Sequence, residues 1–318
     1  MPLYNKEYEV LRAISSVFAQ TVKDFELIVV NDGSTDGSLA IVYGWKDARI
    51  KVIDQLHEGV SAARNRAIAE AQADLIAFLD ADDEWAPDFL ETIFRLRSTF
   101  PSCDVFATQY TFCTSDGMKR PALVRGLPGC FREGILDDYF DIASFSEPPL
   151  WTSAVAVNKL ALTTIGGFQV GITSGEDLLT WSRLALQYNI AYCGEPKAYF
   201  WGPFNVSDRP GRFPKIPDIV GKELAELMRK APAESTPSVK KYLAFWHKMR
   251  AVIFFQLNDR PNFLKEVRTV AKYGRYDPKL FALCLLALLP HRIAYPLFKK
   301  GKQLLAWNAR SANHKAGE

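Results

Sequence analysis

The alternation of short apolar runs with segments of helical pattern, up to residue 110, restricts the possible folds more than any other feature of this chain. The apolar runs predict buried strands over residues 25–30, 50–53, 75–79 and 105–110. Helices are expected between them, over residues 7–20, 36–45, 60–71 and 87–100. Strands that alternate with helices imply right-handed β-α-β units. We therefore predict an α/β fold with a mostly parallel central sheet flanked by helices.

The pattern is less regular beyond about residue 111. Further helices are expected over residues 176–187, 239–257 and 261–273, and the Gly-, Pro- and Arg-rich segment 202–217 indicates a loop. The tail over 280–307 mixes apolar and basic residues. We expect an α/β domain over residues 1–218 and a helical C-terminal region over 219–318.

Composition narrows the class of protein. Of the 318 residues 48% are hydrophobic, which suffices for a sizeable core, and the formal net charge of +3 gives no indication of a nucleic-acid partner. The five cysteines have no C-x-x-C spacing, so neither a disulfide framework nor a zinc site is expected. No signal peptide and no apolar run of roughly 18 residues is found, and a cytoplasmic location is expected.

The acidic segment Asp80-Ala81-Asp82-Asp83 directly follows a predicted buried strand. In an extended segment the side chains of residues i and i+2 point the same way. Asp80 and Asp82 could therefore converge on one hard cation, for which carboxylates are suited when the ion is Mg²⁺ or Mn²⁺. The plainer alternative is a solvated acidic turn that caps the helix expected to begin at Pro87.

A second strand end carries Asp32, within Asn31-Asp32-Gly33-Ser34. Ligands of parallel sheets bind beyond the carboxyl ends of the strands, so Asp32 and Asp80 are expected to face the same crevice. There Asp32 could accept a hydrogen bond from a nucleotide base or ribose. The alternative is a tight turn, for which these residue types are typical. Neither a P-loop nor a G-x-G-x-x-G fingerprint is present.

Two helix starts complete the set of candidate segments. Glu58 to Asn65 offers backbone donors and Arg64, which would suit a diphosphate, although Arg64 could also be an ordinary surface residue. Glu176 and Asp177 open the next predicted helix, where acidic residues complement the helix dipole. In a functional interpretation one of these two carboxylates is a general base.

Together these segments resemble the family-2 inverting glycosyltransferases with the GT-A fold. The resemblance covers roughly residues 1 to 200, and the family's motifs occur in its order and at its usual spacing. The matching stretches are Pro2-Leu3-Tyr4-Asn5, Asp24 to Ser38, Gly59 to Asn65, Phe78 to Asp83, Gly166-Gly167-Phe168, and Glu176-Asp177 followed by Trp181 and Arg183-Leu184.

The resemblance implies a role for each motif residue. On the donor side Tyr4 would flank the base, Asp32 would hydrogen-bond it and Arg64 would lie near the phosphates. Asp80 would meet the ribose or the cation, and Asp82 would hold the cation through the diphosphate. Asp177 would be the catalytic base. The remaining residues implied at the site are Pro2 and Glu7 for the nucleotide-sugar, and Glu176, Trp151, Trp181 and Arg183 on the acceptor side, although a buried aromatic core is the favoured role of the tryptophans.

The implied activity is transfer of a sugar, with inversion, from a nucleotide-sugar to a hydroxyl group of a saccharide or lipid-linked glycan. UDP is the family's commonest carrier, and the setting would be cell-surface polysaccharide or glycoconjugate synthesis. Two other functions stay open, a non-catalytic nucleotide-sugar binding module and a nucleotidyltransferase. The second usually has a Gly-rich, Lys- or Arg-bearing loop after the first strand, where this chain has Tyr4-Asn5.

The chain also departs from the family's pattern. Members begin with an apolar strand that leads into the Pro-x-Tyr-Asn loop, whereas here Met1 stands at that point, so the first strand is expected to be missing. No His occurs over residues 199–207, and we expect no third protein ligand for the cation. Without a Gln-x-x-Arg-Trp signature, addition of a single sugar is expected.

The tail has two interpretations. Leu280 to Pro290 is apolar, and Arg292, Lys299, Lys300 and Lys302 are basic. This combination suits peripheral contact with anionic lipid at the inner face of the cell membrane. It also suits a helical subdomain packed on the catalytic domain.

Overall fold

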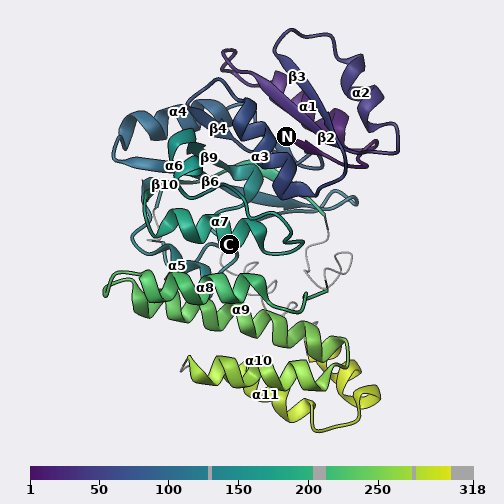
Figure 1. Ribbon diagram of the computed structural model, residues 1–318, viewed down its shortest axis with the longest axis vertical. Helices are drawn as coiled ribbons and strands as arrows, with labels where there is room; N and C mark the ends of the chain where they lie inside the picture. Colours follow the sequence, from purple (N-terminus) through teal and green to yellow (C-terminus); the bar gives the residue numbers. More distant parts are fainter. Residues whose placement is uncertain (128–130, 203–212, 274–276, 302–318) are drawn as a thin grey trace, which may run out of the picture. The chain divides into compact units, whose positions relative to one another are not determined.

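The computed structural model describes residues 1–127, 131–202, 213–273 and 277–301 (Figure 1). Its contacts divide the chain into two compact units: Met1–Arg212 with Pro217–Val239, and Phe213–Ile216 with Lys240–Glu318. The loop predicted over 202–217 and the tail predicted over 280–307 lie partly outside the described residues, and Lys302 lies wholly outside them.

The strands of the first unit form two sheets. The three-stranded sheet has the order β1-β2-β3 and comprises β1 (Pro2–Leu3), β2 (Leu27–Asp32) and β3 (Ile50–Gln55). The seven-stranded sheet has the path β4-β9-β6-β10-β5, with β7 paired to β6 and β8 paired to β10. Its strands are β4 (Leu75–Ala77), β5 (Glu84–Trp85), β6 (Cys103–Cys113), β7 (Lys119–Pro121), β8 (Glu133–Ile135), β9 (Val155–Asn158) and β10 (Asn189–Trp201).

Helices alternate with the strands of this unit, so the α/β class is confirmed. They are α1 (Val10–Phe18), α2 (Ser38–Gly44), α3 (Val60–Glu70), α4 (Phe89–Thr99), α5 (Tyr139–Ala143), the 3₁₀ turn η1 (Thr152–Ala154), α6 (Lys159–Thr164), α7 (Glu176–Ala185) and α8 (Ile219–Lys230). The contacts group α8 with this first unit, whereas the sequence predicted a boundary at residue 218.

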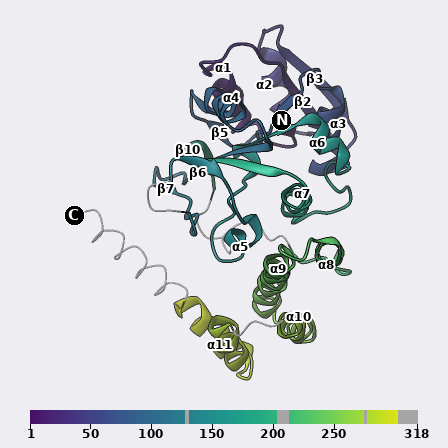
Figure 2. The ribbon, with the colours of Figure 1, turned by 90° about the vertical axis from the view of Figure 1, so that its left-hand side faces the viewer.

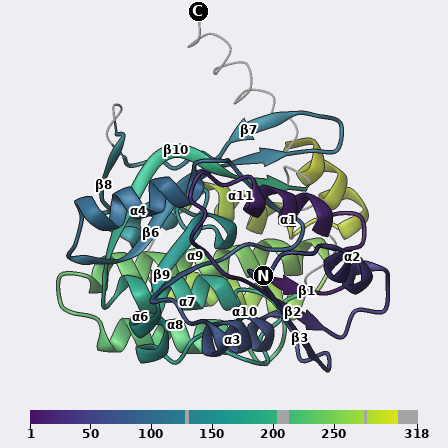
Figure 3. The ribbon, with the colours of Figure 1, turned by 90° about the horizontal axis from the view of Figure 1, so that it is seen from above.

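Strand β2 explains why helices cover both faces of the small sheet. All six of its residues are buried, and successive side chains of a strand point to opposite faces. Leu27 and Val29 join the core that contains α1, while Ile28 and Val30 join the core that contains Ala63 of α3. Helices α1 and α3 accordingly lie on opposite sides of β2 (Figure 3). A continuous apolar run is what a strand covered on both faces requires.

The expectation of a mostly parallel sheet holds for the three-stranded sheet, whereas the larger sheet is mixed. Strands β6 and β10 run side by side and parallel (Figure 2). The other pairings of this sheet are antiparallel, including the one that joins β4 to β9. The segment before Asp80 is thus an antiparallel strand, and it ends at Ala77 rather than at residue 79.

The first strand is short but present. Pro2 pairs with Val30 and Leu3 with Asn31, in parallel register. The expectations that the first strand is missing and that Pro2 and Leu3 form a loop are therefore wrong. Burial supplies the reason, since Leu3 is 0% exposed and belongs to the core that packs on α1. These two residues form an edge of the three-stranded sheet, beside the central strand β2.

The second unit is helical. It contains most of α9 (Thr236–Gln256), which begins in the first unit, α10 (Arg260–Lys272), α11 (Pro278–Leu286) and a further helix over residues 291–301. Two of its helices begin with aspartate caps: Asp259 accepts the Asn262 N–H and Asp277 the Leu280 N–H. Among the described residues, no helix has the length and apolar character needed to cross a membrane.

Candidate functional site

The acidic segment after β4 forms a turn. The Asp83 N–H donates to the Asp80 carbonyl over 3.0 Å, which closes the turn over residues 80–83. The expected extended geometry, with the side chains of Asp80 and Asp82 aligned as on a strand, is therefore wrong. Both carboxylates nevertheless remain accessible, with side chains that are 26% and 32% exposed. Accessible carboxylates from one tight turn suit a hard cation.

Arg64 of α3 links this turn to the start of α7. Its Nη2 lies 2.7 Å from Asp80 Oδ1 and its Nη1 lies 3.5 Å from Glu176 Oε1. The guanidinium also lies over the Phe168 ring, 5.1 Å from its centroid. Burial lowers the pKa of Arg64, but the carboxylates of Asp80 and Glu176 outweigh it and the pKa is raised.

This position corrects the predicted role of Arg64. Its side chain is 4% exposed, so in this structure it does not reach a diphosphate at the surface. It instead organises carboxylates that come from two distant parts of the sequence.

Lys6 is a second cation at the acidic turn, and sequence reasoning missed it. Its Nζ lies 2.7 Å from Asp82 Oδ2, and Arg12 Nη2 donates to the Asp82 carbonyl over 2.6 Å. Partial burial lowers the pKa of Lys6, but the Asp82 carboxylate outweighs it and the pKa is raised. Lys6 directly follows the matching stretch Pro2-Leu3-Tyr4-Asn5, but Asp82 lies 76 positions further along the chain and no spacing rule connects the two residues.

Asp83, the third acid of the turn, points into the protein. Its carboxylate accepts hydrogen bonds from Ser153 Oγ, from Trp151 Nε1 over 3.3 Å and from the Trp201 N–H over 3.3 Å. Burial raises its pKa, and the charges of Asp82 and Asp80 raise it further. Trp151, predicted on the acceptor side, is half-buried and oriented by this bond.

The Asp32 carboxylate already accepts hydrogen bonds from several neighbouring residues. It accepts from Gln55 Nε2 over 2.7 Å and from the backbone N–H groups of Glu58 and Gly59 over 2.9 Å each. His57 Nδ1 lies 2.9 Å from its other oxygen, and the Asp32 side chain is 3% exposed. Asp32 therefore fixes the segment that leads into α3, and in this arrangement it is not free to bind a base.

Both Asp32 and Asp80 contact helix α3 or the residue that precedes it. Gly59 precedes the helix and contacts Asp32, and Arg64 within it contacts Asp80. Five residues of α-helix span about 7.5 Å. Asp32 and Asp80 are thus held along the first turns of the same helix.

Tyr4 lies at the surface of this region and stacks on His57. The ring centroids are 4.1 Å apart at an interplanar angle of 24°. The loop that carries Tyr4 is fixed to the segment after β2, because Glu7 Oε2 accepts the Gly37 N–H over 2.8 Å. Glu7, predicted as a donor contact, is therefore a support of the loop, and Pro2 is part of β1.

The start of α7 presents one accessible acid. Gly175 precedes it with φ of 86°, a conformation that glycine adopts without strain. Asp177 is half-buried, and its Oδ1 accepts the Leu178 N–H over 2.8 Å. Glu176, in contrast, is 3% exposed and faces Arg64, so the structure does not bring it to an acceptor surface.

Two other residues implied on the acceptor side, Trp181 and Arg183, lie in the interior of the first unit. Trp181 is fully buried and packs edge-on against Phe78 and Phe168, so it is a core residue. The side chain of Arg183 is largely buried, and its Nη2 lies 3.1 Å both from Gln169 Oε1 and from Glu223 Oε2. It joins α7 to α8 within the first unit.

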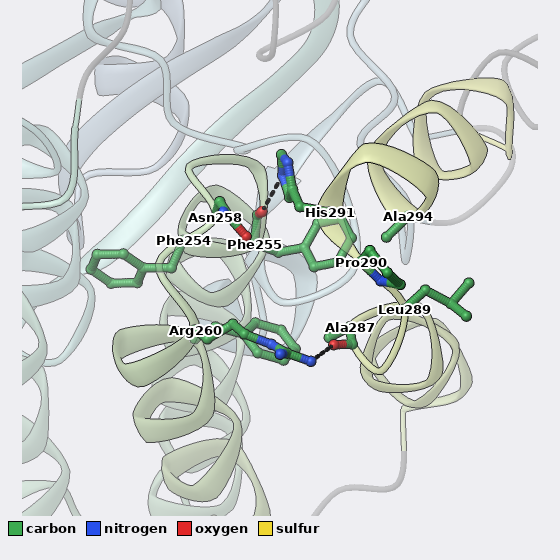
Figure 4. A pocket seen from close by; sticks show the side chains of 10 residues that line it. Phe254, Phe255, Asn258, Arg260, Ala287, Leu289, Pro290, His291 and Ala294 are labelled. Atoms are coloured by element: carbon green, nitrogen blue, oxygen red, sulfur yellow. Dashed lines mark hydrogen bonds between the residues drawn. The ribbon is translucent and has the colours of Figure 1, made fainter.

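The second unit contains a cavity of about 60 Å³, and none of these acidic residues lines it (Figure 4). Phe254, Phe255 and Phe263 line it together with Pro290 and His291. Ligand pockets for small molecules span roughly 300–1,000 Å³, so this cavity is too small for a nucleotide-sugar.

The model of the family described as glycosyl transferase family 2 matches residues 1–146. This segment of the chain is thus similar to glycosyl transferase family 2. The matched segment includes Tyr4, Asp32, Arg64 and the turn over residues 80–83, whereas Asp177 lies beyond it.

Curated glycosyltransferases are similar to part of the chain. GlyA of Streptococcus pneumoniae is 34% identical over 120 residues, which cover 37% of this chain and 17% of that protein. WfgD of Escherichia coli, a UDP-Glc:α-D-GlcNAc-diphosphoundecaprenol β-1,3-glucosyltransferase, is 41% identical over 92 residues, which cover 29% of this chain and 36% of that protein. The match therefore spans about a sixth of the length of GlyA and about a third of the length of WfgD.

Solved structures extend the likeness over most of the chain. TarS of S. aureus, residues 1–349 in complex with UDP-GlcNAc, has a TM-score of 0.68 at 18% identity and covers 86% of this chain and 80% of that one. The mannosyltransferase PcManGT of Pyrobaculum calidifontis, in complex with GDP-Man and Mn²⁺, has a TM-score of 0.53 at 17% identity and covers 95% and 78%. The domain has the GT-A fold.

Proposed function

We propose that the protein is an inverting glycosyltransferase that moves a sugar from a nucleoside-diphosphate donor to a hydroxyl group of an acceptor glycan. The observation that carries this proposal is the buried Arg64, which joins Asp80 of the acidic turn to Glu176, the neighbour of Asp177. This contact holds the acidic turn, which would bind the cation and through it the diphosphate, beside the candidate base Asp177. Transfer with inversion needs these two groups together.

UDP is the nucleotide we propose for the donor. UDP-GlcNAc is bound in the TarS structure, UDP-Glc appears in the name of WfgD, and GDP-Man is bound in PcManGT. The half-exposed ring of Tyr4 would stack on the base. Asp32 would support this site indirectly, through the segment that precedes α3.

Mg²⁺ or Mn²⁺ is the cofactor we propose, held by Asp80 and Asp82. The donor set fits, because both side chains are accessible carboxylates and each already pairs with a cationic side chain, Arg64 and Lys6 respectively. When bound, the cation would neutralise the charge of the leaving diphosphate. Lys6 would add a positive charge at the same place.

Asp177 would act as the general base. It would accept the proton of the acceptor hydroxyl while that oxygen bonds to the anomeric carbon and the bond from this carbon to the diphosphate oxygen breaks. Asp177 lies in the first turn of α7, where its side chain is half-buried and remains accessible. A single displacement of this kind inverts the anomeric configuration.

The test is Asp177→Asn, with release of nucleoside diphosphate and transfer measured separately from donor binding. We expect donor binding near the wild-type level and a loss of transfer of roughly 10²–10⁴-fold, the usual contribution of a general base. Asp24→Asn is the matched control, because Asp24 is exposed on the same unit. Near-normal transfer by Asp177→Asn would remove Asp177 from the mechanism.

The acceptor we propose is a saccharide or a lipid-linked glycan, in the synthesis of cell-surface polysaccharide or glycoconjugate. The name of WfgD gives a diphosphoundecaprenol-linked sugar as the acceptor of that relative. On this proposal the protein works at the inner face of the cell membrane as a peripheral protein.

A further inference from the structure

We propose that α11, the turn over residues 287–290 and the helix over residues 291–301 form a hairpin that inserts its outer side into an anionic lipid bilayer. We refer to this segment, residues 278–301, as the hairpin. The inference deepens the proposed function, on which it rests for the lipid-linked acceptor, by naming the surface that meets the membrane. Its physical basis lies wholly within the second unit.

The inner side of the hairpin is anchored in the core of the second unit. Leu280 and Leu283 of α11 and Ala294 of the last helix are buried. They join a cluster that includes Phe263 of α10 and Phe255 of α9. Both helices of the hairpin are therefore fixed to the unit, and their opposite sides face outward.

The outer side is apolar as well. Leu288 is 75% exposed, Leu285 52% and Leu289 41%, and on the second helix Ile293 and Leu297 are 47% and 48% exposed. Ile293 and Leu297 are four residues apart within one helix, which places them on the same face, whereas Leu288 and Leu289 lie in the turn between the two helices. A helix that packs on a water-soluble core normally shows polar residues on its outer face. A cluster of exposed aliphatic side chains at one place marks a surface for an apolar partner.

The charges of the hairpin identify that partner as anionic. Lys279, Arg292, Lys299 and Lys300 are all exposed. Residues 278–301 contain no Asp or Glu at all, and Asp277, just before them, is paired with Lys248. Aliphatic side chains flanked by Lys and Arg are typical of helices that lie in the interface of an anionic bilayer.

The same charges argue against a second copy of the chain as the occupant. An interface between two identical hairpins would bring the basic residues of both copies close together, and like charges across an interface oppose association. An anionic bilayer accepts the aliphatic side chains and the positive charges at once.

Co-sedimentation with vesicles tests the inference, using vesicles of phosphatidylcholine alone and vesicles that also contain phosphatidylglycerol. We expect the full chain to sediment with the anionic vesicles and to stay in solution with the neutral ones. Leu288→Glu should lower partitioning to the anionic vesicles by about tenfold or more, and Lys299→Glu with Lys300→Glu should have a comparable effect.

Matched controls exist on α10. Leu264 is 47% exposed and Lys265 and Arg268 are exposed, all in the second unit but outside the hairpin. Leu264→Glu, and Lys265→Glu with Arg268→Glu, should leave partitioning near the wild-type level. Equal losses in hairpin and control variants, or equal sedimentation with neutral vesicles, would overturn the inference. So would a dimer in light scattering that Leu288→Glu abolishes.

Donor binding in solution separates this inference from the proposed function. All of these variants should bind the nucleotide-sugar as the wild type does, because none alters the first unit. Lost vesicle binding with intact transfer to a soluble acceptor supports the inference, whereas vesicle binding without donor binding contradicts the proposed function alone.

Discussion

Arg64 is the residue on which the arrangement of the site depends most. It is buried, it contacts Asp80 and Glu176, and the second of these lies 112 residues away in the sequence. The sequence predicted that Arg64 belongs to the site, but a surface role at the diphosphate was expected. Burial of an arginine between two carboxylates depends on tertiary packing, and local pattern does not encode it.

Arg64→Met should therefore destabilise the first unit strongly. Removing one partner of a buried ion pair leaves uncompensated charge, at a typical cost of about 3–5 kcal/mol. Urea unfolding measures the loss, and donor binding should weaken in parallel. Arg66→Met is the control, because the side chain of Arg66 is 54% exposed and its pair with Glu70 lies at the surface, where such pairs contribute about 0–1 kcal/mol. Similar stability of the two variants would contradict a structural role for Arg64.

Lys6 gives a second prediction at this scale. Because its ammonium group pairs with Asp82, it competes with a divalent cation for the same carboxylate. Lys6→Met should bind Mn²⁺ more tightly in the absence of nucleotide, as measured by electron paramagnetic resonance of the free ion. Lys23→Met is the control: Lys23 is exposed and distant in sequence from the turn over residues 80–83, so its replacement should not change the affinity for Mn²⁺. Unchanged Mn²⁺ binding in Lys6→Met would mean that the cation does not use Asp82.

At the scale of elements, apolar runs and helical spacing predicted the existence and order of β2, β3, α3, α4 and α7. The direction in which the strands pair could not be predicted from local sequence, because β4 is antiparallel to β9, a strand about 80 residues later. The choice between a turn and an extended segment at Asp80 likewise stayed open, since Asp and Ala are compatible with either. Long-range pairing decided both points.

Leu3→Ala tests the short first strand. Leu3 is 0% exposed, and truncation of a buried leucine typically costs about 2–5 kcal/mol. We expect a loss in this range on urea unfolding, although the residue lies at the beginning of the chain. Leu160→Ala should have little effect, because Leu160 is 77% exposed. A near-neutral Leu3→Ala would show that β1 contributes nothing to the sheet.

At the scale of the whole molecule, the stability of the second unit should depend on pH through one buried carboxylate. In the second unit the buried Glu266 accepts from Arg250 Nε over 2.8 Å and contacts His247 Nδ1. Burial raises the pKa of Glu266, but the bonds from His247 and Arg250 outweigh it and hold the pKa below its ordinary value of 4.5.

The sign of the pH effect follows from this shift. A carboxylate whose pKa is lower in the folded state stabilises it above the unfolded pKa, and the contribution disappears as the pH falls through the folded pKa. The second unit should lose this contribution below pH 4.5. Glu266→Gln should be less stable at neutral pH and should show a flatter pH dependence, measured by urea unfolding at a series of pH values. An unchanged slope would exclude Glu266 as its source.

The central claim, that the protein transfers sugar from a nucleoside-diphosphate donor, is tested most directly by the purified chain with a panel of UDP- and GDP-sugars and Mn²⁺. Calorimetry reports donor binding and nucleoside diphosphate release reports turnover, for the wild type, Asp82→Asn and Asp177→Asn. We predict binding and turnover of at least one donor, turnover lost in both variants, and binding retained in Asp177→Asn. Binding without turnover by the wild type would indicate a nucleotide-sugar binding module, and absence of binding to every donor would contradict the account.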